Sequence, residues 1–267
     1  MSAAGVGTGV STALLRAEGL VRHFGEERVV DGVDMSVEAG EIHALVGLNG
    51  AGKTTLMRLL LGMLVPDAGR AQLRDDAGLG AGRTIGPGTH SPVDVRQARP
   101  AAWTAVGHLV EAPFGYAELT VTETVQIAAR LRGMTPADAA AQADRVIEAL
   151  ALGHWAAQRA GTLSLGNRQR LGLACAVVHG PRVLVLDEPA NGLDPAGVVL
   201  VREHLLGLAA EGAGILVSSH HLDEMARIAD RTSVLHRGRV VGTLAPDGAD
   251  LERAFFAMVY AADAESR

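Results

Sequence analysis

The sequence has 267 residues, of which 48% are hydrophobic, although 45 residues are alanine and only 3% are aromatic. A chain of this length can bury a hydrophobic core in one domain with a sub-domain, or in two domains. The formal net charge of −6 argues against binding to nucleic acid, because that binding depends on clustered positive charge. The mean hydropathy of +0.19 comes without any window of about 20 apolar residues, which a membrane-spanning helix needs.

The N-terminal part of the chain is predicted to form a tail and then a sheet. Residues 1–12 are small and polar, lack the basic start of a signal peptide and are expected to be disordered. The β-type runs 28–33 and 35–37 follow, separated by glycines, which predicts an antiparallel sheet with tight turns. The glycines of this region are Gly19, Gly25, Gly32 and Gly40.

A strand at 42–46 runs into a glycine-rich loop and a helix, and residues 47–54 fit the pattern G-x-x-x-x-G-K-[ST]. In this pattern backbone N–H groups and a helix N-terminus surround phosphate groups, and the lysine adds a full positive charge. Lys53 is the one lysine among 24 basic residues, and it stands at the lysine position of the pattern. Arginine does not replace lysine there, because its guanidinium is wide and planar whereas the ammonium group is compact. A plain glycine turn is the alternative.

The pattern favours a nucleotide site in which Thr54 also contributes its hydroxyl to Mg²⁺. The residues predicted to bind the nucleotide here are Gly47, Leu48, Asn49, Gly50, Ala51, Gly52, Lys53, Thr54 and Thr55.

The middle of the chain changes character twice. Residues 75–100 hold five glycines and three prolines and are expected to form a surface insertion. A strand at 104–110 and a helical region at about 112–162 should follow, with capping signals for two helices. The signals are Thr120, Glu123 and Gly133 for the first helix, and Thr135, Pro136 and Gly153 for the second.

Apolar strands at 183–186 and 215–217 then alternate with helices, which indicates a parallel α/β sheet. Asp187 and Glu188 end the first of them, at the edge where such sheets bind ligands. Asp187 is predicted to hold Mg²⁺ through water, and Glu188 to act as general base on the water that attacks the γ-phosphate. Solvated turn residues are the alternative, which the phosphate loop upstream disfavours.

Residues 163–170, Leu-Ser-Leu-Gly-Asn-Arg-Gln-Arg, resemble the signature LSGGQ-x-QR of the ATP-binding subunits of ABC transporters, and Ser164 precedes Asp187 by 23 residues as in that family. The resemblance extends from about residue 14 to residue 242. It implies an α/β fold with a P-loop (RecA-like) ATPase core, an N-terminal antiparallel β sub-domain and an inserted helical sub-domain. The single ATPase domain would span 13–245, followed by a short helical tail at 246–267.

The resemblance also implies roles for single residues. Ser164 and Gly166 would present donors to the γ-phosphate bound by a second subunit. Asp194 lies in the loop that crosses the dimer interface, with a simple turn as the alternative. His220 looks like the switch histidine that contacts the γ-phosphate, and Phe24 like the aromatic that stacks on adenine, for which a core phenylalanine is the alternative.

Three positions depart from the family pattern. Leu165 replaces a glycine and Asn167 a glutamine in the signature, and Glu111 stands where the Q-loop glutamine is usual. Glutamate adds a negative charge beside Mg²⁺ and offers only acceptors when ionised. The pattern Glu-Ala-Pro at 111–113, together with Ser-Leu-Gly in the signature, looks like the branch that serves drug, bacitracin and lantibiotic export or self-protection.

The family implies ATP and Mg²⁺ as cofactors, and residues for each role can be carried over. The catalytic residues would be Lys53, Glu188 and His220, and the residues at the metal Thr54, Asp187 and Glu111.

The implied partners are a separately encoded transmembrane permease and a second ATPase subunit, identical or different, at the cytoplasmic face of the cell membrane, with no nucleic acid. Residues 111–119, with Phe114 and Tyr116, are the predicted docking segment for the permease, and packing of both aromatics inside the helical sub-domain is the alternative. A soluble ABC-type ATPase acting on DNA or ribosomes, or a regulatory nucleotide-binding module, are the competing functions.

Overall fold

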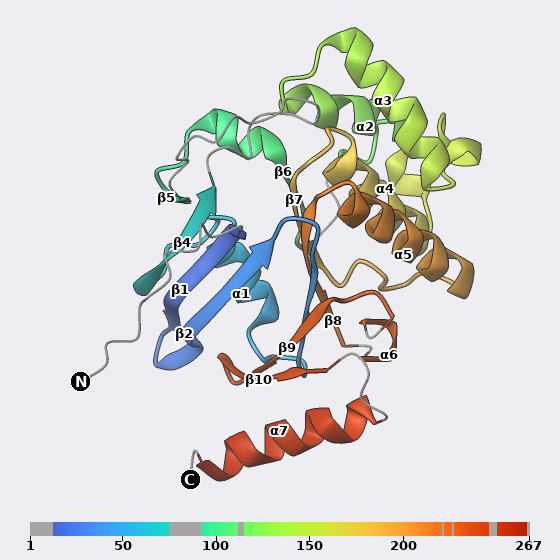
Figure 1. Ribbon diagram of the computed structural model, residues 1–267. Helices are drawn as coiled ribbons and strands as arrows, with labels where there is room; N and C mark the ends of the chain where they lie inside the picture. The colour runs from blue at the N-terminus through green and yellow to red at the C-terminus, as the bar shows by residue number, and fades with distance from the viewer. Residues whose placement is uncertain are drawn as a thin grey trace.

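The computed structural model describes two sheets that lie beside each other, with helices around them (Figure 1). One sheet is antiparallel with strand order β2-β1-β4-β5, and the other has six strands in the order β10-β9-β3-β8-β7-β6. The described residues are 13–74, 92–111, 115–220, 222–225, 227–245 and 250–265.

The antiparallel sheet is built from the N-terminal third of the chain. Its strands are β1 (Ala13–Phe24), β2 (Glu27–Glu38), β4 (Ala68–Arg74) and β5 (Pro92–Asp94). The six-stranded sheet is parallel except for the antiparallel pair β9 and β10. Its strands are β3 (Ile42–Val46), β6 (Val106–Leu109), β7 (Val183–Asp187), β8 (Gly214–Ser219), β9 (Arg231–His236) and β10 (Arg239–Leu244).

Seven α-helices accompany these strands in the described residues, and α2 and α3 form a separate layer at one end of the molecule (Figure 1). The helices are α1 (Lys53–Leu60), α2 (Val121–Leu131), α3 (Pro136–Ala149), α4 (Leu165–Val177), α5 (Pro195–Ala210), α6 (Leu222–Met225) and α7 (Leu251–Glu265). Together the two sheets and the helices give the α/β fold expected from the sequence, with an antiparallel β part and an inserted helical part. None of the described helices is long and apolar enough to span a membrane.

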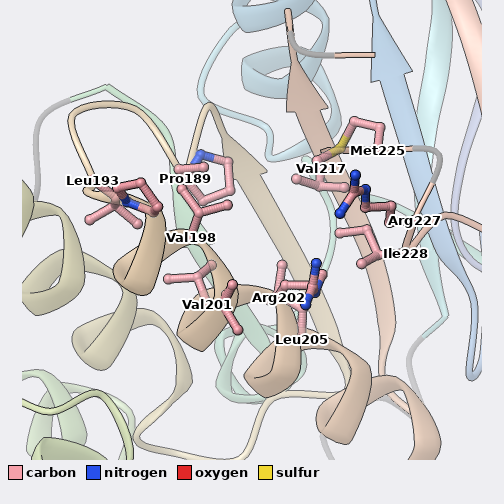
Figure 2. Close-up of a pocket in the computed structure, with 13 residues that line it drawn as sticks. Pro189, Leu193, Val198, Val201, Arg202, Leu205, Val217, Met225, Arg227 and Ile228 are labelled. Carbon is pink, nitrogen blue, oxygen red and sulfur yellow. The ribbon is translucent and has the colours of Figure 1, made fainter. Parts of the chain in front are cut away.

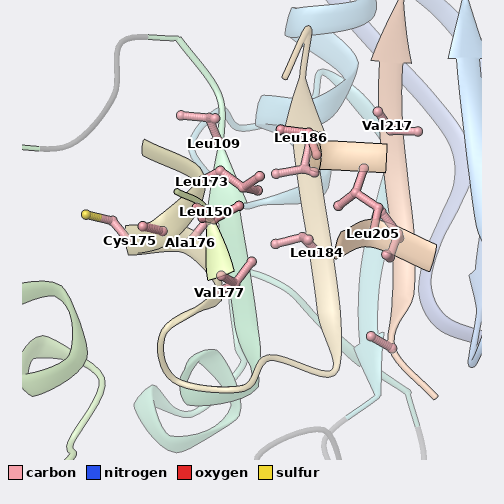
Figure 3. Packing of buried hydrophobic residues seen from close by; sticks show 14 of the residues in the cluster. Leu109, Leu150, Leu173, Cys175, Ala176, Val177, Leu184, Leu186, Leu205 and Val217 are labelled. Atoms are coloured by element: carbon pink, nitrogen blue, oxygen red, sulfur yellow. The ribbon is translucent and has the colours of Figure 1, made fainter. Parts of the chain in front are cut away.

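The hydrophobic core is divided into two clusters by the alternation of side chains along the parallel strands. On β7, Leu184 and Leu186 belong to one cluster, and Val183 and Val185 belong to the other. Figure 3 shows the first cluster, in which side chains of α4 and α5 pack against Leu184 and Leu186. The second cluster joins the opposite face to α1 and the antiparallel sheet. The sheet that carries the predicted site is therefore buried on both faces.

The N-terminal strands are longer than the sequence predicts, because two of the glycines lie inside strands. The runs 28–33 and 35–37 belong to one strand, β2, and Gly32 within it adopts φ +67°. Gly19 lies likewise within β1 at φ +55°, and the pairing of β1 with β2 shifts register around it. Glycines in the left-handed conformation accommodate β-bulges, so these two glycines bend the strands instead of ending them.

The predicted strand at 104–110 is wrong at its start. Residues Pro100–Ala105 form a 3₁₀ helix, in which the Thr104 hydroxyl donates to the Ala101 carbonyl, and β6 begins at Val106. Proline at the first position favours such a helical turn. The surface insertion predicted at 75–100 is also shorter on its C-terminal side, because β5 (Pro92–Asp94) pairs with β4 and belongs to the antiparallel sheet. Residues 75–91 lie outside the described part of the chain.

Three further helix boundaries were predicted from glycines and caps. The capping box of Thr120 and Glu123 is present, with both reciprocal hydrogen bonds, and Gly133 follows the end of α2 in the left-handed conformation. The prediction that Gly153 ends the second helix is wrong: α3 stops at Ala149, and Gly153 opens a short 3₁₀ helix. Ala151, at φ +52°, takes the left-handed conformation that the sequence assigned to a glycine.

The sequence predicts a disordered tail at the N-terminus and a short helical tail at the C-terminus. The predicted tail at 1–12 lies outside the described residues. The C-terminal segment 246–267 contains α7, and the side chains of Phe255 and Val259 on this helix are buried in the first core cluster. The helix therefore packs against the domain through an apolar face.

Two half-buried histidines, His108 and His179, make the stability of the fold depend on pH. Burial, with a smaller contribution from the charge of Arg132, lowers the pKa of His108 to about 4. The pKa of His179 is also lowered to about 4, mainly by burial. In the unfolded chain both would bind a proton below about pH 6.5, whereas the folded protein resists protonation until about pH 4. Stability is therefore full above pH 6.5 and is lost as the pH falls toward 4.

We expect the free energy of unfolding to fall between pH 7.5 and pH 5.5 by roughly 1 kcal/mol for each of these two histidines. Urea denaturation at the two pH values measures the difference. His108→Gln should reduce the pH dependence, while His154→Gln, at an exposed position, should leave it unchanged. Equal stability of the parent protein at both pH values would contradict the prediction.

Candidate active site

The predicted phosphate loop connects the end of β3 to the start of α1, which begins at Lys53. Gly52 adopts φ +104°, and a Cβ on it would lie 2.5 Å from the Val29 carbonyl oxygen. A Cβ on Gly47 would lie 2.3 Å from the carbonyl oxygen of Leu235. Both glycines are thus required by close backbone approach, and Gly52 is also required by its left-handed conformation. Of the remaining residues, Leu48, Asn49 and Gly50 are exposed, Ala51 is buried, and Thr54 and Thr55 lie in the first turn of α1.

Lys53 lies inside this loop, and only 7% of its surface is exposed. Its Nζ donates a hydrogen bond to the Gly47 carbonyl oxygen at 2.7 Å and lies 3.6 Å from Oε1 of Glu188. The ammonium group is therefore held between the loop and the acid that follows β7. Its charge is shielded from water, so a phosphate group entering the loop meets a strong, fixed positive charge.

Asp187 joins three elements at the end of β7. Its Oδ2 accepts a hydrogen bond from the Thr54 hydroxyl at 2.5 Å, and its Oδ1 accepts one from the Ser218 hydroxyl at 2.5 Å. Parallel pairing of β7 with β8 places Asp187 directly opposite Ser218. Ser218 was not among the residues predicted from the sequence, although its position at the end of an apolar strand, two residues before His220, was a usable signal.

Glu188 lies at the centre of the arrangement, in the left-handed conformation at φ +51°. Its backbone N–H donates to the Ser218 hydroxyl at 2.9 Å, and its carbonyl oxygen accepts a bond from the Gln169 amide at 3.1 Å. One carboxylate oxygen faces Lys53, and the other lies 2.7 Å from Nδ1 of His220. The structure thus brings Lys53, Glu188 and His220 together, and Gln169 is a second residue at the site that was not predicted from the sequence.

The signature segment and the predicted interface loop lie against each other. Ser164 is the N-cap of α4, where its hydroxyl accepts a hydrogen bond from the Asn167 N–H. Leu165 covers Gly192, on which a Cβ would lie 2.6 Å from the Leu165 Cδ2. Gly166 also approaches this loop, since a Cβ there would lie 2.9 Å from the Gly192 carbonyl oxygen. The leucine that departs from the family pattern is thus accommodated by a glycine in the neighbouring loop.

Asp194 has a clear local role as the N-cap of α5, where its carboxylate accepts a hydrogen bond from the Gly197 N–H at 2.8 Å. This agrees with the simple reading of a turn before Pro195 and leaves a role between subunits as a prediction. The cap also fixes the direction in which the loop leaves β7.

Three aromatic residues were left with two alternatives by the sequence, and the two that the structure describes are exposed. Phe24 is 46% exposed, which excludes the core alternative, and the Arg22 guanidinium lies 5.1 Å from its ring centroid. Tyr116 is 69% exposed, so it does not pack inside the helical sub-domain. Phe114 lies outside the described residues.

Glu111 follows β6 in the left-handed conformation at φ +75°. Its carboxylate forms an ion pair with the guanidinium of Arg58 on α1, and its side chain is 54% exposed. The residue thus bridges the sheet edge and the helix that starts at the phosphate loop. A role at the metal remains a prediction. To bind Mg²⁺, the Glu111 carboxylate would have to release the Arg58 guanidinium.

The donor chemistry fits Mg²⁺ that is bound largely through phosphates and water. Asp187 and Thr54 supply a carboxylate and a hydroxyl oxygen within hydrogen-bond distance of each other. Magnesium in nucleotide sites keeps several waters and uses one or two protein carboxylates. In the described residues there is no cluster of three or more His, Cys, Asp or Glu side chains that would form an all-protein cage.

Comparison with known proteins gives a consistent result. Residues 30–191 match the family model described as ABC transporter. The chain is 32% identical over 231 residues to the bacitracin transport ATP-binding protein BcrA of Bacillus licheniformis, covering 86% of this chain and 69% of that protein. It is 38% identical over 231 residues to the Nod factor export ATP-binding protein I of Ralstonia nicotianae, covering 86% and 67%.

A solved structure described as the ATP-binding subunit of an ABC transporter superposes on the chain with a TM-score of 0.75 at 27% identity. The superposition covers 92% of this chain and 94% of that one. The family match, the identities and the fold agree over the region that holds the phosphate loop, the signature and both acids.

Proposed function

Because this chain belongs to the ABC transporter family as an ATP-binding and ATP-hydrolysing subunit, we propose that it powers a separate transmembrane permease that exports drug or antibiotic-like molecules. The observation that carries the proposal is the arrangement of Lys53, Glu188 and His220 around one point at the end of the parallel sheet. One relative is named for bacitracin transport and another for Nod factor export, which supports transport of an antibiotic-like molecule and export as its direction.

The chemistry proposed for the site follows from its geometry. The loop N–H groups and Lys53 would bind the β- and γ-phosphates, and Glu188 would accept the proton of the attacking water. His220, which contacts the Glu188 carboxylate, would orient that water and the γ-phosphate. Bound Mg²⁺ supplies positive charge that offsets the charge developing on the phosphate oxygens. Thr54 and Asp187 would hold it, and Ser218 keeps Asp187 in place.

The signature segment supports a dimer of ATPase subunits. Ser164 and Gly166 lie at the N-terminus of α4, where partial positive charge and free N–H groups favour an anion. We infer that this helix end binds the γ-phosphate held by a second subunit, identical or different. Because Leu165 packs against Gly192, the signature segment and the loop that holds Asp194 would then move together when the subunits associate.

We propose that the protein works at the cytoplasmic face of the cell membrane as a peripheral subunit, with no nucleic acid partner. The exposed Tyr116 supports the segment 111–119 as a contact with the permease. A soluble ATPase acting on DNA or ribosomes is the runner-up, and the net charge of −6 disfavours it.

Affinity purification of the tagged protein from membranes tests the function. We expect a polytopic membrane protein to copurify, and the isolated complex to hydrolyse ATP in a Mg²⁺-dependent manner that the exported compound stimulates. Recovery with ribosomes or DNA in place of a membrane protein would contradict the transport role. Nucleotide binding without turnover would instead identify a regulatory module.

The Glu111→Gln variant tests the role of the Q-loop glutamate. Because the carboxylate would be a supporting group of the metal site, we expect the Mg²⁺ concentration for half-maximal ATP turnover to rise by roughly tenfold. Arg58→Gln is the matched control: it removes the ion-pair partner of Glu111 but leaves the carboxylate free to reach the metal. An unchanged Mg²⁺ dependence in Glu111→Gln would remove Glu111 from the metal site.

A further inference from the structure

A cavity of about 410 Å³ lies among α5, β8 and the side chains of Met225, Arg227 and Ile228. Pro189, which directly follows Glu188, and Val217, which directly precedes Ser218, are part of its wall. Its volume is within the range of roughly 300–1,000 Å³ that is typical of small-molecule sites. The cavity therefore has the size of a ligand site. Two of its lining residues, Pro189 and Val217, are chain neighbours of Glu188 and of Ser218, which holds Asp187.

The lining combines an extended apolar surface with two positive charges. Eleven of the thirteen lining residues are apolar, and the other two are Arg202 and Arg227. Figure 2 shows Pro189, Leu193 and Val198 toward one end of the cavity and both arginines toward the other. An uneven distribution of this kind matches a ligand with an apolar body and a charged end.

Among the residues whose side chains the structure describes, which do not include Asp223 and Glu224, the two arginines have no acidic partner. Other arginines of the protein do: Arg231 pairs with Glu41 and Arg239 pairs with Asp31. A guanidinium offers a planar fork of N–H donors that suits carboxylate, sulfonate or phosphate oxygens. An anionic group is thus the chemical complement that these two side chains lack.

We propose that this cavity binds an amphipathic anion, with an aliphatic chain or ring system packed on α5 and an acidic group paired with Arg202 and Arg227. The apolar part would displace water from the surface formed by Leu193, Val198 and Leu205. The inference goes beyond the proposed function, because binding at this site does not require ATP hydrolysis or a membrane partner.

The position of the cavity gives such a ligand a route to the active site. Leu193 belongs to the loop that Leu165 of the signature segment contacts through Gly192, and the residue before Pro189 is Glu188. A bound molecule that shifts this loop would change ATP turnover without touching the nucleotide. Turnover with and without the ligand is therefore a second readout.

Binding of dodecanoate, below its micelle-forming concentration, tests the site. Displacement of the fluorescent sulfonate 1-anilinonaphthalene-8-sulfonate provides the measurement, and dodecan-1-ol serves as an uncharged ligand of the same chain length. We expect the Arg202→Gln/Arg227→Gln variant to bind dodecanoate about tenfold more weakly, which corresponds to about 1.4 kcal/mol, and to bind dodecan-1-ol as the parent does. Arg145→Gln, an exposed arginine on α3, is the matched control.

A second variant tests the apolar half of the site. Val198→Trp places a large side chain at a half-buried position of the wall and should abolish binding of both ligands while nucleotide binding persists. The proposal is overturned if dodecanoate does not bind the parent protein, or if it binds the parent and the double arginine variant equally. Equal binding to the parent and to a folded Val198→Trp variant would also overturn it.

Discussion

ATP turnover by the Glu188→Gln variant should fall by about 10²- to 10⁴-fold, the usual contribution of a general base. Glutamine keeps the size of the side chain and can still contact His220, but it cannot accept the proton of the attacking water. ATP binding should persist, because Lys53 and the loop are unchanged and Lys53 loses a competing negative charge 3.6 Å away. The variant should therefore accumulate ATP-bound dimers.

Phosphate release under single-turnover conditions and size-exclusion chromatography with Mg·ATP measure these two effects. Glu203→Gln, the same chemical change at an exposed position of α5, is the matched control and should behave as the parent. Turnover within a factor of two of the parent would exclude Glu188 as the base. Loss of ATP binding as well would show that the substitution disturbs the loop.

Lys53→Ala should weaken ATP binding by at least about a hundredfold. The variant removes a buried charge that faces the phosphates, and truncation of one partner in a buried charge pair costs about 2–5 kcal/mol. It also leaves Glu188 without its positive neighbour, so part of the loss will reflect a rearranged site. Lys53→Arg should fail to restore binding, because the guanidinium is too wide for a position that is 7% exposed.

Fluorescent-nucleotide titration gives the affinities, and Thr55→Ser, in the same helical turn, is a conservative control. Because Lys53 is the only lysine, an amine-directed reagent offers an independent check with the N-terminus as internal reference. Labelling of Lys53 should be slow in the free protein, since the ammonium is already buried and bonded to Gly47, and slower still with Mg·ATP. Labelling at the N-terminal rate with saturating nucleotide would contradict the assignment of the phosphate loop.

The parts of the site that the sequence predicts best are contiguous in the chain. Residues 47–55 form a loop and first helical turn whose function depends on local spacing, and the caps at Thr120 and Ser164 are likewise local. Strand ends are also predictable, because an apolar run that stops at Asp187 places that acid at the edge of the sheet. The family resemblance added His220 and the signature, which no local pattern distinguishes.

The sequence by itself determined the α/β class, the phosphate loop and the two acids, since each depends on residues that are neighbours in the chain. Only the tertiary structure decided the contacts between distant segments: Ser218 on Asp187, Lys53 against Glu188, and Arg58 on Glu111. It also decided that Gly19 and Gly32 lie in bulges and that Gly47 must lack a side chain, because Leu235 approaches it from β9. Such contacts arise from strand pairing and packing across the chain, which spacing along the sequence does not encode.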